Sequence, residues 1–301
     1  MKKDFYKANS DFICRDIENN CEQIQYKNNS YIRIWCNEQP VTYDSHWHTA
    51  LEIIMPVEND YDAIINQTPY HICAGEFLLV PPGEMHTLIA PDSGRRFIFQ
   101  FDITLISKIY GFSSIRSLIS KPLHITQTAF PHAYKSLFQL LDQIKEEYFS
   151  ENEYSELMIT SLLLNFFVKL GYHHIHTQNL FPDVQLPKQR EYVQKFNDIL
   201  EYIDMHYTDE LTLDIMAVHS GFSKFHFSRL FKQYTNYTFN DYLNFRRIKA
   251  AEEMLLDPAL SITEIAMQSG FSSISTFNRL FKQMKNCTPS EFRALHFKII
   301  F

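Results

Sequence analysis

One pattern occurs twice in the C-terminal third of this sequence, and it limits the fold more than any other feature. The first copy, Gly221 to Asn236, reads GFSKFHFSRLFKQYTN, and the second, Gly270 to Asn286, reads GFSSISTFNRLFKQMKN. The segment RLFKQ recurs with its arginines, Arg229 and Arg279, 50 positions apart. Internal repetition of this kind indicates two copies of one supersecondary unit.

Each copy follows a short segment in which apolar residues recur at helical spacing. These residues are Leu213, Met216 and Ala217 before the first copy, and Ile262, Ile265 and Ala266 before the second. The glycine then turns the chain, and Ser223 or Ser272 is expected to cap the next helix. The order of helix, short turn and helix predicts helix-turn-helix motifs over residues 211–235 and 261–286.

The second helix of each motif has one apolar face and one polar face. The predicted inward residues are Phe227, Leu230, Phe231 and Tyr234 in the first copy and Phe277, Leu280, Phe281 and Met284 in the second. Positive charge is concentrated on the second helices and the segments after them, with a net +5 over residues 221–249 and +4 over 270–298. The segments before them are acidic, with −5 over 190–220 and −4 over 250–269.

This separation of charge indicates what the polar faces bind. A helix in the major groove of DNA needs Lys and Arg near phosphates and a few side chains that reach base edges. Two helical repeats with solvated faces are the alternative interpretation. We expect DNA contacts from the outward residues Lys224, Phe225, Ser228, Arg229, Lys232, Ile274, Ser275, Asn278, Arg279 and Lys282.

Residues from about 192 to 297 resemble the DNA-binding domain of the AraC/XylS family of bacterial transcription regulators, in which a long helix joins two such motifs. The resemblance lies in the alanine–glycine spacing before each turn, the Arg-Leu-Phe-Lys core and Thr288-Pro289 after the second copy. The family usually has glycine where this chain has Asn236 and Asn286, and asparagine tolerates the left-handed conformation that this position requires. The joining helix is predicted from Phe239 to Leu255.

Residues 31–102 predict a small antiparallel barrel, because many short strands there are separated by turn-forming residues. The predicted strands are Tyr31–Cys36, Leu51–Val57, Asp60–Ile65, Pro69–Cys73, Glu76–Val80, His86–Ala90 and Arg96–Asp102. Two turns are expected, at residues 58–60 and 66–68.

Within this region the residues His46, His48 and Glu52, followed by Gly75, Pro81, Gly83 and His86, resemble the two cupin motifs. The first motif of that family normally ends in glycine where Asn59 stands. In an extended chain His46, His48 and Glu52 fall on one face, because their separations are even. His46, His48, Glu52 and His86, called the quartet below, are therefore expected to bind an effector, together with Arg33. Ile53 and Met55 are expected to make the cavity partly dry.

Three imidazoles and a carboxylate are also a ligand set for zinc, iron, nickel or manganese. The alternative is that the quartet forms hydrogen bonds to an organic effector and holds no metal. A divalent metal in the cupin site is the one cofactor that the sequence suggests.

Two helices follow the strands. The second, predicted over Glu153–Tyr172, is apolar nearly all round, so it needs cover on more than one side. One cover is the barrel, and the other is expected to be the same helix of a second subunit; entirely intramolecular packing is the alternative. Phe166 and Phe167 point in different directions, so at least one of them is expected to lie at the dimer interface, with Leu163 nearby.

The predicted fold class is multidomain α+β. The expected parts are an effector-sensing barrel over residues 1–125, a helical dimerisation hairpin over 126–175, a linker over 176–190 and a DNA-binding domain over 191–298. Five cysteines without paired spacing favour reduced thiols and a cytoplasmic location. No export signal or membrane span is recognised, and the net charge of −7 falls within residues 1–189.

The sequence therefore predicts a DNA-binding transcription regulator that responds to a small molecule, and not an enzyme. Its expected partners are double-stranded operator DNA, the effector, a second copy of the chain and RNA polymerase, and no membrane. The alternative is a metal-dependent cupin enzyme that carries a DNA-binding tail. The identity of the effector, the operator sequence and the choice between activation and repression do not follow from the sequence.

Overall fold

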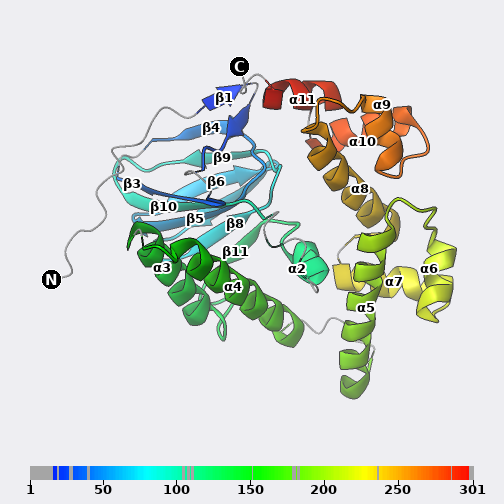
Figure 1. Cartoon of the computed structure of the whole chain (residues 1–301). Helices are drawn as coiled ribbons and strands as arrows, with labels where there is room; N and C mark the ends of the chain where they lie inside the picture. The colour runs from blue at the N-terminus through cyan, green and yellow to red at the C-terminus, as the bar shows by residue number, and fades with distance from the viewer. Residues whose placement is uncertain are drawn as a thin grey trace. The chain divides into compact units, whose positions relative to one another are not determined.

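The structure is a computed structural model that describes residues 16–18, 20–26, 30–38, 41–103, 106, 109, 112–150, 152–177, 181, 184–235, 237–285 and 287–297. The chain divides into two compact units, Met1–Gln178 and Asn179–Phe301, called the N-terminal and the C-terminal unit below. The N-terminal unit contains antiparallel strands followed by helices, and the C-terminal unit is helical (Figure 1). The predicted α+β class is confirmed.

The strands of the N-terminal unit form a five-stranded sheet, in the order β11-β8-β5-β10-β3, a four-stranded sheet, in the order β4-β9-β6-β7, and a small pair β1-β2. Their bounds are β1 Asp16–Glu18, β2 Cys21–Gln23, β3 Ile32–Asn37, β4 Tyr43–His46, β5 Leu51–Glu58, β6 Tyr61–Ile65, β7 Thr68–Ile72, β8 Phe77–Val80, β9 His86–Ile89, β10 Arg95–Phe101 and β11 Leu123–Ile125.

All seven predicted strands are present, as β3 and β5 to β10. Among the described residues the edge strands β3, β4, β7 and β11 each pair on one side only, so the sheets stay open and do not close into a barrel. The sequence did not predict β1, β2, β4 or β11, which have three or four residues each and are too short to show an alternating pattern.

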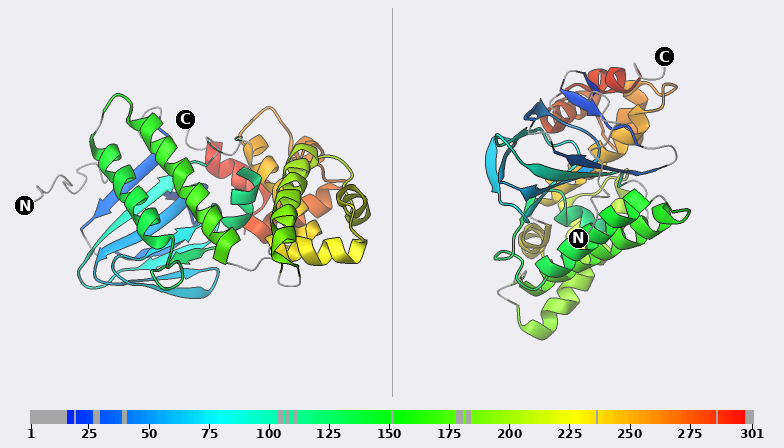
Figure 2. Two further views of the ribbon diagram at one scale, coloured as in Figure 1. Left: turned by 90° about the horizontal axis from the view of Figure 1, so that it is seen from below. Right: turned by 90° about the vertical axis from the view of Figure 1, so that its left-hand side faces the viewer.

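Alternation along β5 and β10 separates two cores. Leu51, Ile53 and Met55 belong to a core cluster with Phe97 and Phe99 of β10 and with residues of two long helices, α3 (Tyr134–Ser150) and α4 (Ser155–Thr177). These helices lie along one face of the five-stranded sheet (Figure 2). The opposite face carries a second cluster, which includes Ile54, Leu88 and Ile98 and packs between the two sheets. The odd-numbered residues Ile53 and Met55 therefore face the helices. The expectation that they line the cavity of the quartet was wrong.

Two predicted turns adopt left-handed backbone. Asn59 has φ of 56°, and its side-chain nitrogen donates to the carbonyl oxygen of Ser93 at 2.7 Å. This residue stands where the resemblance to the cupin family led us to expect glycine, and asparagine is among the few residues that adopt this conformation readily. Asn66 and Gln67 also have positive φ, 47° and 70°, at the tip of the β6–β7 hairpin, as two-residue hairpin turns require.

The apolar helix α4 is covered within its own unit more completely than predicted. Phe166 and Phe167 are 0% and 1% exposed, and Phe167 packs edge-on against Phe112 of a short helix, α2 (Phe112–Leu118). Leu163 is 4% exposed. The expectation that one of the two phenylalanines lies at a subunit interface was wrong, because both are buried within the N-terminal unit and Phe112 of α2 packs against Phe167.

The C-terminal unit consists of helices only, among its described residues. Their bounds are α5 Leu186–His206, α6 Leu213–Ser220, α7 Lys224–Thr235, α8 Phe239–Leu255, α9 Ile262–Gln268, α10 Ile274–Lys285 and α11 Pro289–Phe297. The predicted bounds of α8 are confirmed, and the side-chain oxygen of Thr238 caps it by accepting a hydrogen bond from the backbone nitrogen of Asp241. Helix α4 extends to Thr177 and α5 begins at Leu186, so both helices run into the expected linker.

A buried ion pair connects α8 to α10. The Nζ atom of Lys285 lies 2.7 Å from Oε1 of Glu252, and their side chains are 5% and 10% exposed. Lys249 approaches the other carboxylate oxygen at 3.2 Å. Burial alone would raise the pKa of Glu252, but the two lysines hold it below its ordinary value.

Two negative findings apply to the described residues. None of their helices has the combination of length and apolar character that a bilayer span requires. The described cysteines, Cys21, Cys36, Cys73 and Cys287, are all free thiols.

Candidate functional site

The structure brings the quartet together from two different sheets. His46 ends β4 and His86 begins β9, both in the four-stranded sheet, whereas Glu52 belongs to β5 of the five-stranded sheet. His48 lies in the connection between β4 and β5. The even spacing of His46, His48 and Glu52 therefore predicted that these side chains come together, but for the wrong reason. They do not share one strand, because β4 ends at His46 and β5 begins at Leu51. All four residues are buried, with exposed fractions of 4% or less.

A backbone carbonyl oxygen holds the Nδ1 atom of each imidazole. Since a carbonyl oxygen only accepts hydrogen bonds, each Nδ1 carries the hydrogen and donates it. The Nε2 atom of each neutral ring then offers a lone pair. The contacts are His46 Nδ1 to Asp44 at 2.7 Å, His48 Nδ1 to Ala50 at 3.1 Å and His86 Nδ1 to Glu84 at 2.9 Å.

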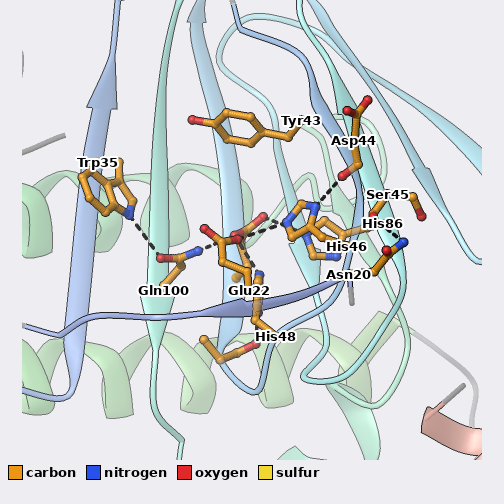
Figure 3. A network of polar contacts seen from close by, with 12 residues as sticks. Asn20, Glu22, Trp35, Tyr43, Asp44, Ser45, His46, His48, His86 and Gln100 are labelled. Carbon is orange, nitrogen blue, oxygen red and sulfur yellow. Dashed lines mark hydrogen bonds and ion pairs between the residues drawn. The ribbon is translucent and has the colours of Figure 1, made fainter. Parts of the chain in front are cut away.

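The Nε2 atoms face carboxylates. The separations are 3.2 Å from His46 to Glu22, 3.0 Å from His48 to Glu52 and 3.4 Å from His86 to the second oxygen of Glu52. Ligand atoms of the three histidines lie within 4.8 Å of one another. Figure 3 shows the rings gathered around the carboxylates. This group of buried lone pairs and carboxylates, called the acceptor centre below, needs positive charge or hydrogen-bond donors to be stable.

The contact between His48 and Glu52 shifts the pKa values of both groups. Burial opposes the charged form of His48, but the charge of Glu52 and the hydrogen bond to it raise the pKa of His48 above its ordinary value. Burial likewise opposes ionisation of Glu52, yet His48 and His86 hold its pKa well below its usual range. A protonated His48 beside an ionised Glu52 is thus one way to balance the acceptor centre.

A relay of hydrogen bonds orients Glu52. The side-chain nitrogen of Gln100 donates to Glu52 at 2.9 Å, and the indole nitrogen of Trp35 donates to Gln100 at 3.2 Å. Gln100 is directly opposite Glu52 in the β10–β5 pairing. Sequence reasoning missed Gln100, although its even-numbered position on a predicted strand next to the quartet was a usable signal.

Glu22 was also missed, and no sequence signal could have found it. It lies on the three-residue strand β2, outside the cupin motifs, and its backbone nitrogen donates to the carbonyl oxygen of Trp47 at 2.8 Å. Arg33 was expected to join the quartet, but its guanidinium lies over the Trp35 ring, 4.0 Å from the ring centre. Among the described residues we find no hydrogen bond or ion pair between Arg33 and the quartet.

The second candidate site is the polar face of the two helix-turn-helix motifs, α6–α7 and α9–α10. Gly221 and Gly270 have φ of 69° and 88°, and each ends the first helix of its motif. The backbone nitrogens of Phe222 and Phe271, the residues that follow, donate to the carbonyl oxygens of Ala217 and Ala266 at 3.0 Å in both copies. This is the hydrogen-bond pattern of a glycine-ended helix.

The two turns differ in length after the glycine. Ser223 caps α7 by accepting from the backbone nitrogen of His226 at 3.3 Å, but in the second copy Ser273 caps α10, accepting from Thr276 at 3.2 Å. The prediction of Ser272 as the cap was therefore wrong. The second turn contains one more residue, which is why the glycines are 49 positions apart while the arginines are 50 apart.

The inward and outward faces agree with the predicted pattern. Phe227, Leu230, Phe231 and Tyr234 of α7 and Phe277 and Phe281 of α10 are buried, whereas Leu280 and Met284 are partly buried. The exposed outward residues are Lys224, Phe225, Arg229, Lys232, Ser275, Asn278, Arg279 and Lys282, and the half-exposed ones are Ser228 and Ile274. Lys224 is paired with Asp214 at 2.8 Å on the surface.

Comparison with known proteins gives the same picture of the C-terminal unit. A model described as a helix-turn-helix domain matches residues 216–295. The chain is 38% identical over 99 residues to "Probable transcription factor PqrA" of Proteus vulgaris, covering 32% of this chain and 81% of PqrA. It is 39% identical over 99 residues to the "Regulatory protein PocR" of Salmonella typhimurium, covering 33% of each chain.

Among solved structures, ToxT of Vibrio cholerae is similar at 15% identity and a TM-score of 0.44, covering 89% of this chain and 98% of ToxT. The chain spans 81% of PqrA but only a third of PocR.

The two turn glycines predict unequal costs of one substitution. An alanine at either position has a left-handed backbone, which costs about 1–2 kcal/mol. At Gly270 the added Cβ would also lie 2.8 Å from the Cα of Thr208 and from the carbonyl oxygen of Tyr207, whereas at Gly221 the nearest atom is the Nζ of Lys195 at 3.8 Å. We expect Gly270→Ala to destabilise the C-terminal unit by about 1–3 kcal/mol more than Gly221→Ala. Urea unfolding of the full chain measures both, and equal losses would contradict the close approach.

Proposed function

Because the chain belongs to the AraC/XylS family of transcription regulators, we propose that it binds specific operator DNA through α7 and α10 and responds to an effector bound at the acceptor centre. The observation that supports the effector site is the acceptor centre itself. Buried carboxylates and imidazoles destabilise a fold unless a partner compensates them. An apolar core at this place would serve the N-terminal unit better if packing were its only role.

The effector that fits supplies positive charge or hydrogen-bond donors. A divalent transition-metal ion does so, alone or with an organic molecule bound to it. Such ions bind imidazole nitrogen and carboxylate oxygen at about 2.0–2.2 Å, which puts neighbouring ligand atoms roughly 3–3.5 Å apart. The Nε2-to-carboxylate separations here are 3.0 to 3.4 Å, and the Nδ1–H contacts to carbonyl oxygens are those that orient metal-bound histidines.

His46, His48, His86 and Glu52 would hold the ion, with Glu22 as an additional oxygen ligand. Arg33 would contact the effector only at the edge of the site, where its guanidinium lies over the ring of Trp35. A cupin enzyme with a DNA-binding tail remains the alternative class, and the names of the relatives, which are regulators, favour the sensor. Turnover of a substrate by the metal-loaded protein would favour the enzyme.

The DNA interface would use the exposed residues of α7 and α10. Arg229 and Arg279 occupy equivalent places, and arginine is the commonest reader of guanine in the major groove. Phe225 is 83% exposed, which is unusual for phenylalanine and fits apolar contact with a thymine methyl group. Helix α8 would place the two motifs on adjacent turns of the groove. Since the partner is promoter DNA, we expect the protein to act in the cytoplasm and to meet RNA polymerase there.

A second copy of the chain is the proposed partner of α4. One stripe of this helix is exposed and uncharged, and consists of Leu157, Met158, Ser161, Asn165, Val168 and Tyr172. Leu157 is 71% and Tyr172 61% exposed. Two copies of the stripe can pack about a two-fold axis without burying a charge, as a symmetric dimer requires.

We predict that Arg229→Ala and Arg279→Ala each weaken operator binding about tenfold or more, since a lost bidentate base contact costs about 1–3 kcal/mol. Fluorescence anisotropy with an operator found by genomic footprinting measures the affinity. Arg95→Ala, which removes an arginine of the N-terminal unit, is the control for charge and should bind normally. If both α7 and α10 variants keep wild-type affinity, the assignment of these arginines is wrong.

We predict that Glu52→Gln lowers the affinity for Mn²⁺ at least tenfold and abolishes the transcriptional response, while folding and operator binding persist. Manganese is the probe because it prefers carboxylate to thiolate ligands, and its electron paramagnetic resonance signal reports binding. The control is Glu58→Gln, an exposed carboxylate at the end of β5. Unaltered Mn²⁺ binding by Glu52→Gln would exclude a metal at the quartet, and an unaltered response would show that the signal enters elsewhere.

We predict that the double substitution Leu157→Glu with Val168→Glu converts a dimer into monomers, because it places four like charges in the proposed interface. Gln139→Glu with Gln143→Glu adds the same charge to exposed positions of α3 and should leave the dimer intact. Light scattering of the full chain at micromolar concentration gives the mass. A wild-type monomer would rule out the stripe as an interface.

A further inference from the structure

A second group of metal-ligand side chains lies outside the acceptor centre, at the open end of the β6–β7 hairpin. Asp60 precedes β6, His71 lies near the end of β7 and Cys73 follows it. Ligand atoms of these three residues lie within 4.8 Å of one another. The side chains of Asp60 and His71 are 45% and 61% exposed, so an ion can enter from solvent.

Asp62 orients the imidazole of His71. The two residues are directly opposite in the β6–β7 pairing, and Nδ1 of His71 lies 2.7 Å from Oδ1 of Asp62. The carboxylate only accepts, so Nδ1 donates and Nε2 of the neutral ring offers its lone pair on the other side. A carboxylate on the far nitrogen is the usual companion of a metal-bound histidine.

The carboxylate of Asp60 is held in place as well. Its Oδ1 atom accepts a hydrogen bond from the backbone nitrogen of Ala74 at 2.8 Å. The other oxygen, Oδ2, lies 3.4 Å from Nε2 of His71. A lone pair and a carboxylate oxygen that face each other are two acceptors suited to a cation between them.

Cys73 completes a mixed donor set. Its position is fixed by its backbone nitrogen, which donates to the carboxylate of Glu76 at 3.0 Å. Thiolate, imidazole and carboxylate are together the ligands of zinc, and three protein ligands leave a fourth position for water.

We propose that Asp60, His71 and Cys73 form a binding site for Zn²⁺ or a similar thiophilic divalent ion, with Asp62 as the residue that positions His71. This site is independent of the acceptor centre. On binding, the ion takes the place of the thiol proton of Cys73, which is released to solvent. Without the ion, a protonated His71 can form ion pairs with both Asp60 and Asp62.

Cobalt titration of the full chain tests the site. Co²⁺ bound to a thiolate gives a sulfur-to-metal charge-transfer absorption in the near ultraviolet, and the quartet contains no sulfur. We expect the wild type to show this absorption and Zn²⁺ to remove it by competition. Cys73→Ser should abolish the absorption, whereas Cys287→Ser, a cysteine of the other unit, should retain it.

Two further variants separate this site from others. Asp62→Asn should weaken cobalt binding about 10–100-fold, the effect expected when a partner of a ligand is lost. Glu52→Gln should leave the absorption intact, even if it removes metal from the quartet. The proposal is wrong if the wild type shows no charge-transfer absorption, or if Cys73→Ser shows the same absorption as the wild type.

Discussion

The N-terminal unit depends on the two-residue alternation of β5 and β10, which both lie in the middle of the five-stranded sheet. One set of residues, such as Leu51 and Phe99, packs on α3 and α4. The other set faces the second sheet and includes both Glu52 and Ile54. Because the helices supply an apolar core on one side, the other side can accommodate a polar group without losing the fold. The acceptor centre reduces the apolar packing between the two sheets. The apolar core between the five-stranded sheet and the helices compensates for the stability that is lost there.

Much of this could be predicted from the sequence, where a pattern extends over enough residues. Strands such as β5 and β10, with eight and seven residues, show alternation clearly, and α8 begins at a capping threonine and ends before Asp257-Pro258. The quartet was predicted from the resemblance to the cupin motifs, and the even spacing of His46, His48 and Glu52 supported it. The repeat at Gly221 and Gly270 located both motifs, since a left-handed turn needs the same residue type wherever it occurs.

The features that were missed depend on contacts distant in sequence. Glu22 reaches the centre only because β2 lies against Trp47, and a three-residue strand has no periodicity to read. Phe166 and Phe167 differ in direction, but α2 covers the second one, and no residue of α4 reveals that cover. Ser272 and Ser273 are both capable caps, and only the hydrogen bond to Thr276 distinguishes them. In each case local chemistry permitted several outcomes and tertiary packing selected one.

The additional residue in the second turn makes the two motifs inequivalent. The added residue lies in the turn, because α7 and α10 both have 12 residues and carry Arg229 and Arg279 at equivalent positions. The exposed residues differ as well, with Phe225 and Ser228 on one helix and Ser275 and Asn278 on the other. If α7 and α10 contact DNA as proposed, two unlike helices in a fixed order give the bound DNA a direction. A target sequence read in this way would be asymmetric, and reversing it at a promoter would reverse the orientation of the bound protein.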